Sequence, residues 1–148
     1  MSAAAGPRMV LGYDGRESSR HAARWAAREL APDGTLVIVH ACRPLHAPVD
    51  PLGRASEREE IGRAMIDELI MDGGQEINEI SVVTEVLDED PVSAVIGAAE
   101  RHGAKAIVLG HERHSRVHRA LGVLTSELLS RSPVPVVSVP DGASVGVH

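Results

Sequence analysis

Short apolar stretches alternate along this chain with longer stretches of mixed polarity. Runs rich in Val, Ile and Leu are typical of buried strands, whereas apolar residues three or four positions apart are typical of helices. The pattern therefore predicts strands and helices in strict alternation. The expected strands are 9–13, 35–41, 81–86, 105–109 and 134–139, and the expected helices are 21–30, 54–71, 91–102 and 121–130.

Residues that favour turns and helix ends separate these stretches. Asp14-Gly15 is a turn signal after the first strand, and Ser18 or Ser19 is expected to cap the helix that follows. Pro91 is suited to the first position of a helix. The acids at 89 and 90 just before it are interpreted as helix-start residues rather than as a catalytic pair.

Strands that alternate with helices of crossover length predict an α/β fold. We expect one domain over residues 1–148, with its core at about 8–140: a doubly wound, Rossmann-like sheet of five parallel strands with four helices. Ligands of such sheets bind in a crevice at the carboxyl ends of the strands. In this chain those ends fall at 12–14, 40–42, 87–90 and Gly110.

Composition narrows the classes of partner. The net charge of −6 disfavours binding to a nucleic-acid polymer, which requires a basic surface. Cys42 is the only cysteine, so an intrachain disulfide is impossible, and a reducing compartment is expected. Because no apolar run reaches the roughly 20 residues of a membrane span, we expect a cytoplasmic protein without membrane contact.

The segment 106–125 has the order of a phosphate site: an apolar strand, Gly110, a basic loop, Gly122 and a helix start. Backbone N–H groups at a helix N-terminus attract anions. The segment is nevertheless no P-loop, because Val123 stands where that motif has Lys. The loop also carries three arginines and three histidines: Arg113, Arg116, Arg119, His111, His114 and His118.

The loop histidines and His40 allow further interpretations. Metal binding by the loop histidines is disfavoured against a solvated basic loop, because no acidic or cysteine partner completes a ligand set nearby. His40, at the end of the second strand, is interpreted as a structural imidazole, although its position at a strand end keeps it a candidate for the site.

Several stretches together resemble the universal stress protein family. They are LGYDGRESSRHAARWAAREL, LVIVHA, DEDPVSAVIGAAERHGAKAIVLG and LGVLTSELLSRSPVPVVSVP, which span nearly the whole chain. The resemblance implies a five-stranded Rossmann-like domain that dimerises, commonly through its last strand, here Val134 to Val139. It also implies that the chain could bind ATP, as many members of the family do.

The ATP motif of that family, G-x2-G-x9-G-[ST], is altered in this chain. Gly110 matches the first glycine and Gly122 the third, but Arg113 replaces the second and the next spacer is one residue short. Val123 stands at the hydroxyl position, and Thr125 matches a further hydroxyl position. By resemblance, Asp14, Gly12 and Ala41 adjoin the adenosine. The implied nucleotide-binding set is Gly12, Asp14, Ala41, Gly110, Arg113, Gly122, Val123, Leu124 and Thr125.

Two main hypotheses remain open. In the first, the chain is a regulatory protein that binds ATP or another adenine nucleotide with altered phosphate contacts, and Mg²⁺ enters only if ATP is bound. In the second, it is a nucleotide-free homodimer whose altered loop meets a protein partner. An enzyme is a third possibility, in which Asp14 and the acids at 88–90 contribute, but no nucleophile–base pair is evident. At most, slow ATP hydrolysis is expected.

Overall fold

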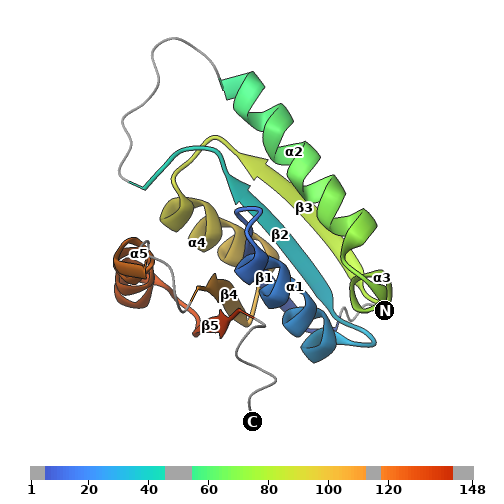
Figure 1. Ribbon diagram of the computed structural model, residues 1–148. Coiled ribbons are helices and arrows are strands. Elements are labelled where there is room, and N and C mark those ends of the chain that lie inside the picture. The colour runs from blue at the N-terminus through green and yellow to red at the C-terminus, as the bar shows by residue number, and fades with distance from the viewer. Residues whose placement is uncertain (1–5, 46–54, 113–117, 142–148) are drawn as a thin grey trace.

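The computed structural model describes residues 6–45, 55–112 and 118–141, with side chains left undescribed at 118–122. Strands and helices alternate along these residues, with one additional short helix after the second long one (Figure 1). In chain order the elements are β1 (Arg8–Gly12), α1 (Glu17–Leu30), β2 (Thr35–Ala41), α2 (Ala55–Asp72), α3 (Gln75–Asn78), β3 (Ser81–Leu87), α4 (Pro91–His102), β4 (Ala106–His111), α5 (His118–Arg131) and β5 (Val136–Pro140).

The predicted alternation is confirmed, and most element ends shift by three residues or fewer. The largest shift is at α1, which begins at Glu17 rather than at 21. The serine cap predicted for this helix was wrong: its N-cap is Arg16, and no side chain caps it. The reading of Asp90 as a helix-start residue is confirmed, because its carboxylate accepts hydrogen bonds from the backbone N–H groups of Val92 and Ser93.

All five strands are parallel and lie in the order β3-β2-β1-β4-β5. The chain thus winds outward from β1 to β3, returns to the other side of β1 and continues to β5. The direction of winding reverses between β1 and β4. Connections from these two strands leave the sheet toward opposite faces, which opens a crevice at their carboxyl ends.

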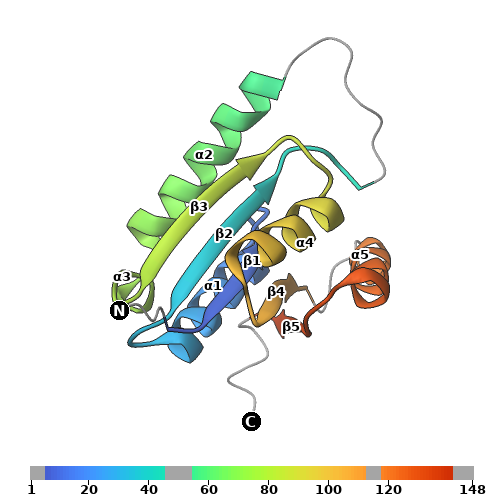
Figure 2. The ribbon, with the colours of Figure 1, turned by 180° about the vertical axis from the view of Figure 1, so that it is seen from behind.

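The sheet is the middle layer of three. Figure 1 shows α1 and α2 in front of it, and Figure 2, from behind, shows α4 and α5 on the other face. The central strand β1 is buried on both faces, since Leu11 packs in the core with α1 and α2, and Val10 packs in the core with α4 and α5. This two-sided burial explains why the strands read as continuous apolar runs.

Candidate functional site

A cavity of about 540 Å³ opens at the carboxyl ends of the strands, beside the reversal between β1 and β4. Its volume lies within the range of small-molecule sites, roughly 300 to 1,000 Å³. The residues that line it come from the ends of β1, β2 and β4, the loops after them, the start of α1, and the facing sides of α4 and α5. They are Gly12, Tyr13, Asp14, Arg16, Ser19, Val39, His40, Ala41, Cys42, Arg43, Pro44, Leu45, Pro91, Val95, Leu109, Gly110, Leu124, Thr125 and Leu128.

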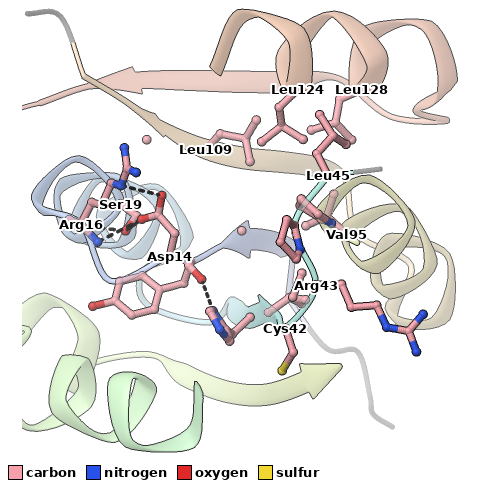
Figure 3. A pocket seen from close by; sticks show the side chains of 18 of the residues that line it. Asp14, Arg16, Ser19, Cys42, Arg43, Leu45, Val95, Leu109, Leu124 and Leu128 are labelled. Atoms are coloured by element: carbon pink, nitrogen blue, oxygen red, sulfur yellow. Dashed lines mark hydrogen bonds and ion pairs between the residues drawn. The ribbon is translucent and has the colours of Figure 1, made fainter. Parts of the chain in front are cut away.

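One side of the cavity is an apolar wall. Leu109 from β4, Val95 from α4, and Leu124 and Leu128 from α5 converge there, and Leu45 approaches from the loop after β2 (Figure 3). Leu128 is fully buried, and the other four belong to or pack against the same core cluster as Leu128. A wall of this kind favours a flat apolar group such as a heterocyclic base.

The opposite side is polar and is organised by Asp14. Its Oδ1 atom accepts hydrogen bonds from the backbone N–H of Arg16 at 3.0 Å and from the hydroxyl of Ser19 at 2.8 Å. These bonds fix the turn that leads from β1 into α1. The carboxylate is still half exposed, with 51% of its side-chain surface accessible. It can therefore accept a hydrogen bond from a ligand hydroxyl or amine.

Arg16 connects the two lips of the crevice. Its Nη1 atom donates a hydrogen bond to Oε1 of Glu112 at 2.8 Å, and its Nε lies 3.8 Å from Oδ2 of Asp14. Glu112 directly follows β4, whereas Arg16 directly precedes α1. The hydrogen bond to Glu112 raises the pKa of Arg16 above its ordinary value, with a smaller contribution from Asp14.

A second arginine lines the cavity at the end of β2. Arg43 binds Asp88 through two hydrogen bonds, Nε to Oδ1 and Nη2 to Oδ2, both 2.9 Å long. Arg58 of α2 approaches the same carboxylate at 3.7 Å. The hydrogen bond from Arg43 is the main cause that lowers the pKa of Asp88. This parallel, fork-like pairing holds the loops after β2 and β3 together.

Cys42 and His40 have structural surroundings. Cys42 is buried, and burial raises the pKa of its thiol, which disfavours the reactive thiolate. His40 places Nδ1 at 2.9 Å from the carbonyl oxygen of Tyr13. Since a carbonyl only accepts, Nδ1 carries the proton and donates it, and the imidazole braces the end of β1.

Gly110 is needed for the close approach of α1 to β4. A Cβ at this position would lie 2.4 Å from the carbonyl carbon of Ser18 and 2.5 Å from the backbone N of Ser19. At Gly12 a Cβ would meet only side-chain atoms, Leu109 Cδ2 at 3.0 Å and Val95 Cγ1 at 3.3 Å. The first contact is with backbone and cannot yield, so the start of α1 touches β4 only because residue 110 is glycine.

Six of the residues predicted for the site lie together in the cavity lining: Gly12, Asp14, Ala41, Gly110, Leu124 and Thr125. Val123 is half exposed and is not among the described lining residues. Gly122 lies within α5, but its surroundings are not described, and Arg113 lies outside the described residues, as do Arg116 and His114.

Several lining residues were not predicted from the sequence. Arg16, the N-cap of α1, and Ser19, in its first turn, follow shortly after Asp14, so their closeness in sequence to that aspartate was the available signal. Arg43 comes directly after the β2 end already singled out. Val95, Leu109 and Leu128 were indistinguishable from core residues, because burial alone does not reveal which core residues border a cavity.

Within 6–45, 55–112 and 118–141, no three His, Cys, Asp or Glu side chains are grouped closely enough to hold a metal ion. No helix in the same residues combines the length and apolar character needed to cross a membrane.

Comparison with known proteins gives matches by family model and by structure. A structure of a universal stress family protein from Burkholderia pseudomallei has a TM-score of 0.62 and 23% identity, covering 94% of this chain and 99% of that one. A universal stress protein in complex with cAMP has a TM-score of 0.56 and 22% identity, covering 94% and 100%. An Arabidopsis thaliana family member with AMP bound has a TM-score of 0.60 and 13% identity, covering 94% of each chain.

A search of curated proteins gives no match. At the identities above, the solved structures show the shared fold alone. The family model is more specific, because it describes universal stress proteins and matches residues 7–140, nearly the whole chain. The chain therefore belongs to the universal stress protein family.

Proposed function

We propose that this protein is a cytoplasmic regulatory protein that binds an adenine nucleotide, ATP or AMP, in the cavity at the β1–β4 reversal. The observation that carries the proposal is the division of the cavity into an apolar wall around Leu109 and Leu124 and a polar side built on Asp14. The wall suits a base, and the half-exposed carboxylate suits a donor on the ribose or the base.

The comparisons add support from relatives of the same fold. One related structure is a complex with cAMP, and another has AMP bound. Adenosine is the part that these ligands share. In this chain the adenosine side of the cavity retains Gly12, Asp14 and Ala41, whereas the phosphate motif is altered at Arg113 and Val123. A nucleotide with few phosphates therefore fits the retained features best, and Mg²⁺ accompanies the ligand only if it is ATP.

Calorimetric titration with ATP, ADP, AMP and cAMP tests the proposal. We expect saturable binding of at least one of them, weakened about tenfold in Asp14→Asn, because a hydrogen bond to a charged group contributes roughly 1.5–3 kcal/mol. Asn retains an oxygen that can accept from Arg16 and Ser19, so the turn is kept. Asp72→Asn, an exposed position at the end of α2, is the matched control and should bind like the wild type. Absence of binding by the wild type at millimolar ligand would exclude the proposal.

The second candidate is a nucleotide-free homodimer, and the position of β5 favours it. This strand lies at the edge of the sheet, beside β4 only. The backbone N–H of Asp141 donates to the carbonyl of His111 in β4. Because backbone N–H groups alternate in direction along a strand, those of Val139 and Val137 also point toward β4, and the N–H of Ser138 points outward. An outward donor at an edge strand can pair with a second copy.

We therefore propose that two copies associate through Val134 to Val139, whether or not a nucleotide is bound. Ser138→Pro removes an outward donor while it leaves the pairing with β4 intact, so it should convert the dimer into a monomer in sedimentation equilibrium. Ser138→Ala keeps the N–H and should remain dimeric. A wild-type protein that is monomeric at working concentration would contradict the dimer.

A further inference from the structure

The guanidinium of Arg16 lies between two carboxylates at the polar side of the cavity. It is hydrogen-bonded to Glu112 across the crevice and lies close to Asp14 on its own side. Figure 3 shows Arg16 beside Asp14 and Ser19, across the cavity from the leucines of the apolar wall. Its side chain is 45% exposed, so a ligand in the cavity can reach it without unfolding the turn.

The two arginines of the lining differ in availability. Arg43 presents its fork to both oxygens of Asp88, so it can bind an anion only by giving up two good hydrogen bonds. Arg16 gives one short hydrogen bond to Glu112 and makes only a longer contact with Asp14. A planar guanidinium binds phosphate through two parallel N–H donors, and a phosphate offers more charge and more acceptor oxygens than one carboxylate.

The geometry of the cavity directs a phosphate toward this arginine. A base seated against the leucine wall, with its sugar near Asp14, places whatever follows the sugar on the polar side. That side holds the start of α1 and the end of β4, which meet at Gly110. Arg16 and Glu112 lie at this junction, one on each element.

We propose, resting on the nucleotide function above, that Arg16 recognises the phosphate of the bound nucleotide and that Glu112 competes with that phosphate for the same guanidinium. The site then distinguishes nucleotides from nucleosides through the side chain of residue 16. The ion pair across the crevice is exchanged for a pair with the ligand when a nucleotide binds. Arg16 lies outside the glycine motif from which phosphate contacts were predicted, and Glu112 occupies one of the two unspecified positions between Gly110 and residue 113.

The test compares AMP with adenosine by calorimetry, because the ratio of the two affinities isolates the contribution of the phosphate. Arg16→Gln should lower the affinity for AMP about tenfold and change the affinity for adenosine less than about twofold, as expected for loss of a charge-assisted hydrogen bond. Arg16→Lys keeps the positive charge but not the two parallel N–H donors, and it should restore part of the ratio of AMP to adenosine affinity. Glu112→Gln removes the competing carboxylate, so it should raise the affinity for AMP several-fold and leave the affinity for adenosine unchanged.

A second ion pair of the same helix provides the control. Arg20 of α1 binds Glu68 of α2 at 2.7 Å, and neither residue is in the cavity lining. Arg20→Gln and Glu68→Gln should leave the ratio of AMP to adenosine affinity unchanged. A general effect of charge or stability would appear in these variants as well, so it is separated from recognition of the phosphate.

The possible results separate the two proposals. If the wild type binds adenosine and AMP but Arg16→Gln leaves their ratio unchanged, the role of Arg16 is overturned and the nucleotide function stands. If Glu112→Gln weakens AMP, Glu112 orients Arg16 and does not compete, which overturns the competition. If the wild type binds neither adenosine nor any of ATP, ADP, AMP and cAMP, both proposals are overturned.

Discussion

Two arginines line the same cavity, and their ion pairs span different parts of the sheet. The pair between Arg43 and Asp88 joins the ends of β2 and β3, which are neighbouring strands on one side of the reversal. The pair between Arg16 and Glu112 joins the ends of β1 and β4, the strands between which the winding reverses. The first pair is bidentate and supported by Arg58, and the second has a single short hydrogen bond.

The difference follows from topology. Loops after β2 and β3 run beside each other, so a short, parallel pairing of side chains joins them. The helices that follow β1 and β4, α1 and α5, lie on opposite faces of the sheet (Figure 1 and Figure 2), and the long side chain of Arg16 reaches from one strand end to the other. The ion pair between Arg16 and Glu112 has a single short hydrogen bond, so it can be exchanged for a pair with a ligand. We therefore expect perturbations at the reversal to change binding, and perturbations at Arg43 to change stability.

The largest expected effect is that of Gly110→Ala. The added Cβ would lie 2.4 to 2.5 Å from backbone atoms of Ser18 and Ser19, so α1 must move away from β4. We expect the free energy of unfolding, measured by urea denaturation, to fall by about 3 kcal/mol, at the upper end for overpacking. The same movement separates Arg16 from Glu112 and leaves the Arg43 pair in place.

Gly97→Ala is the matched control for this substitution. A Cβ at Gly97, inside α4, meets only the terminal Nη1 atom of Arg101 at 3.1 Å, and that flexible side chain can yield. Alanine is also the better helix former, so the free energy of unfolding should rise by roughly 0.5 to 1 kcal/mol. Equal destabilisation by both substitutions would show that the contact with α1 is not the cause.

A smaller effect is expected from Ser19→Ala. The Ser19 side chain is buried, and its hydroxyl lies 2.8 Å from Oδ1 of Asp14 and 2.9 Å from the carbonyl oxygen of Arg16. Its removal should lower the free energy of unfolding by about 1 kcal/mol, the usual contribution of one hydrogen bond. Because the turn that carries Asp14 and Arg16 is loosened, adenosine and AMP affinity should fall together.

This outcome differs from that expected for Arg16→Gln, which lowers the affinity for AMP but not that for adenosine. Ser130→Ala serves as the control, since its hydroxyl also bonds a backbone carbonyl, that of Ser126, but on the exposed side of α5. That variant should bind both ligands like the wild type. A Ser19→Ala protein with unchanged binding would mean that the turn is held by the N–H of Arg16 alone.

The fold could be predicted from the sequence because the strands β1, β2 and β4 are mostly buried, which gives continuous apolar runs, and because α1 and α4 each have a buried face. The continuous run at 35–41 could only be a central strand, and Asp14 and Ala41 could be placed in the site because strand ends converge at one edge. The universal stress resemblance, confirmed by the family model, rests on the same stretches.

The cap of α1 and the role of Arg16 could not be predicted, for a local reason. Ser18 or Ser19 was expected to cap the helix, but the helix begins earlier, at Glu17, and the Ser19 hydroxyl donates to Asp14. A serine inside the first turn no longer precedes the free N–H groups that an N-cap side chain accepts from. The contact between Arg16 and Glu112 joins residues 96 positions apart, and no local pattern indicates such a pair.

The smallest expected effect concerns Asp88 and appears only in acid. The Arg43 hydrogen bond lowers the pKa of Asp88 in the folded protein below its value in the unfolded chain. The unfolded state therefore binds the proton more readily. The ionised Asp88 therefore stabilises the folded state. Its contribution to the free energy of unfolding is complete above the usual aspartate pKa of about 4 and is lost as the pH falls through the lowered pKa. In urea denaturation, the difference between wild type and Asp88→Asn should be constant above about pH 5 and shrink below about pH 4.

Arg43→Met identifies the source of this dependence. In the Arg43→Met background, Asp88→Asn should produce a smaller pH-dependent difference, because the largest cause that lowers the pKa of Asp88 is removed while Arg58 remains. Neither variant should change the ratio of AMP to adenosine affinity, in contrast to Arg16→Gln. If Arg43→Met lowered that ratio as much as Arg16→Gln, both arginines would bind the phosphate. The bidentate pair of Arg43 would then be exchanged for the ligand as readily as the pair across the crevice.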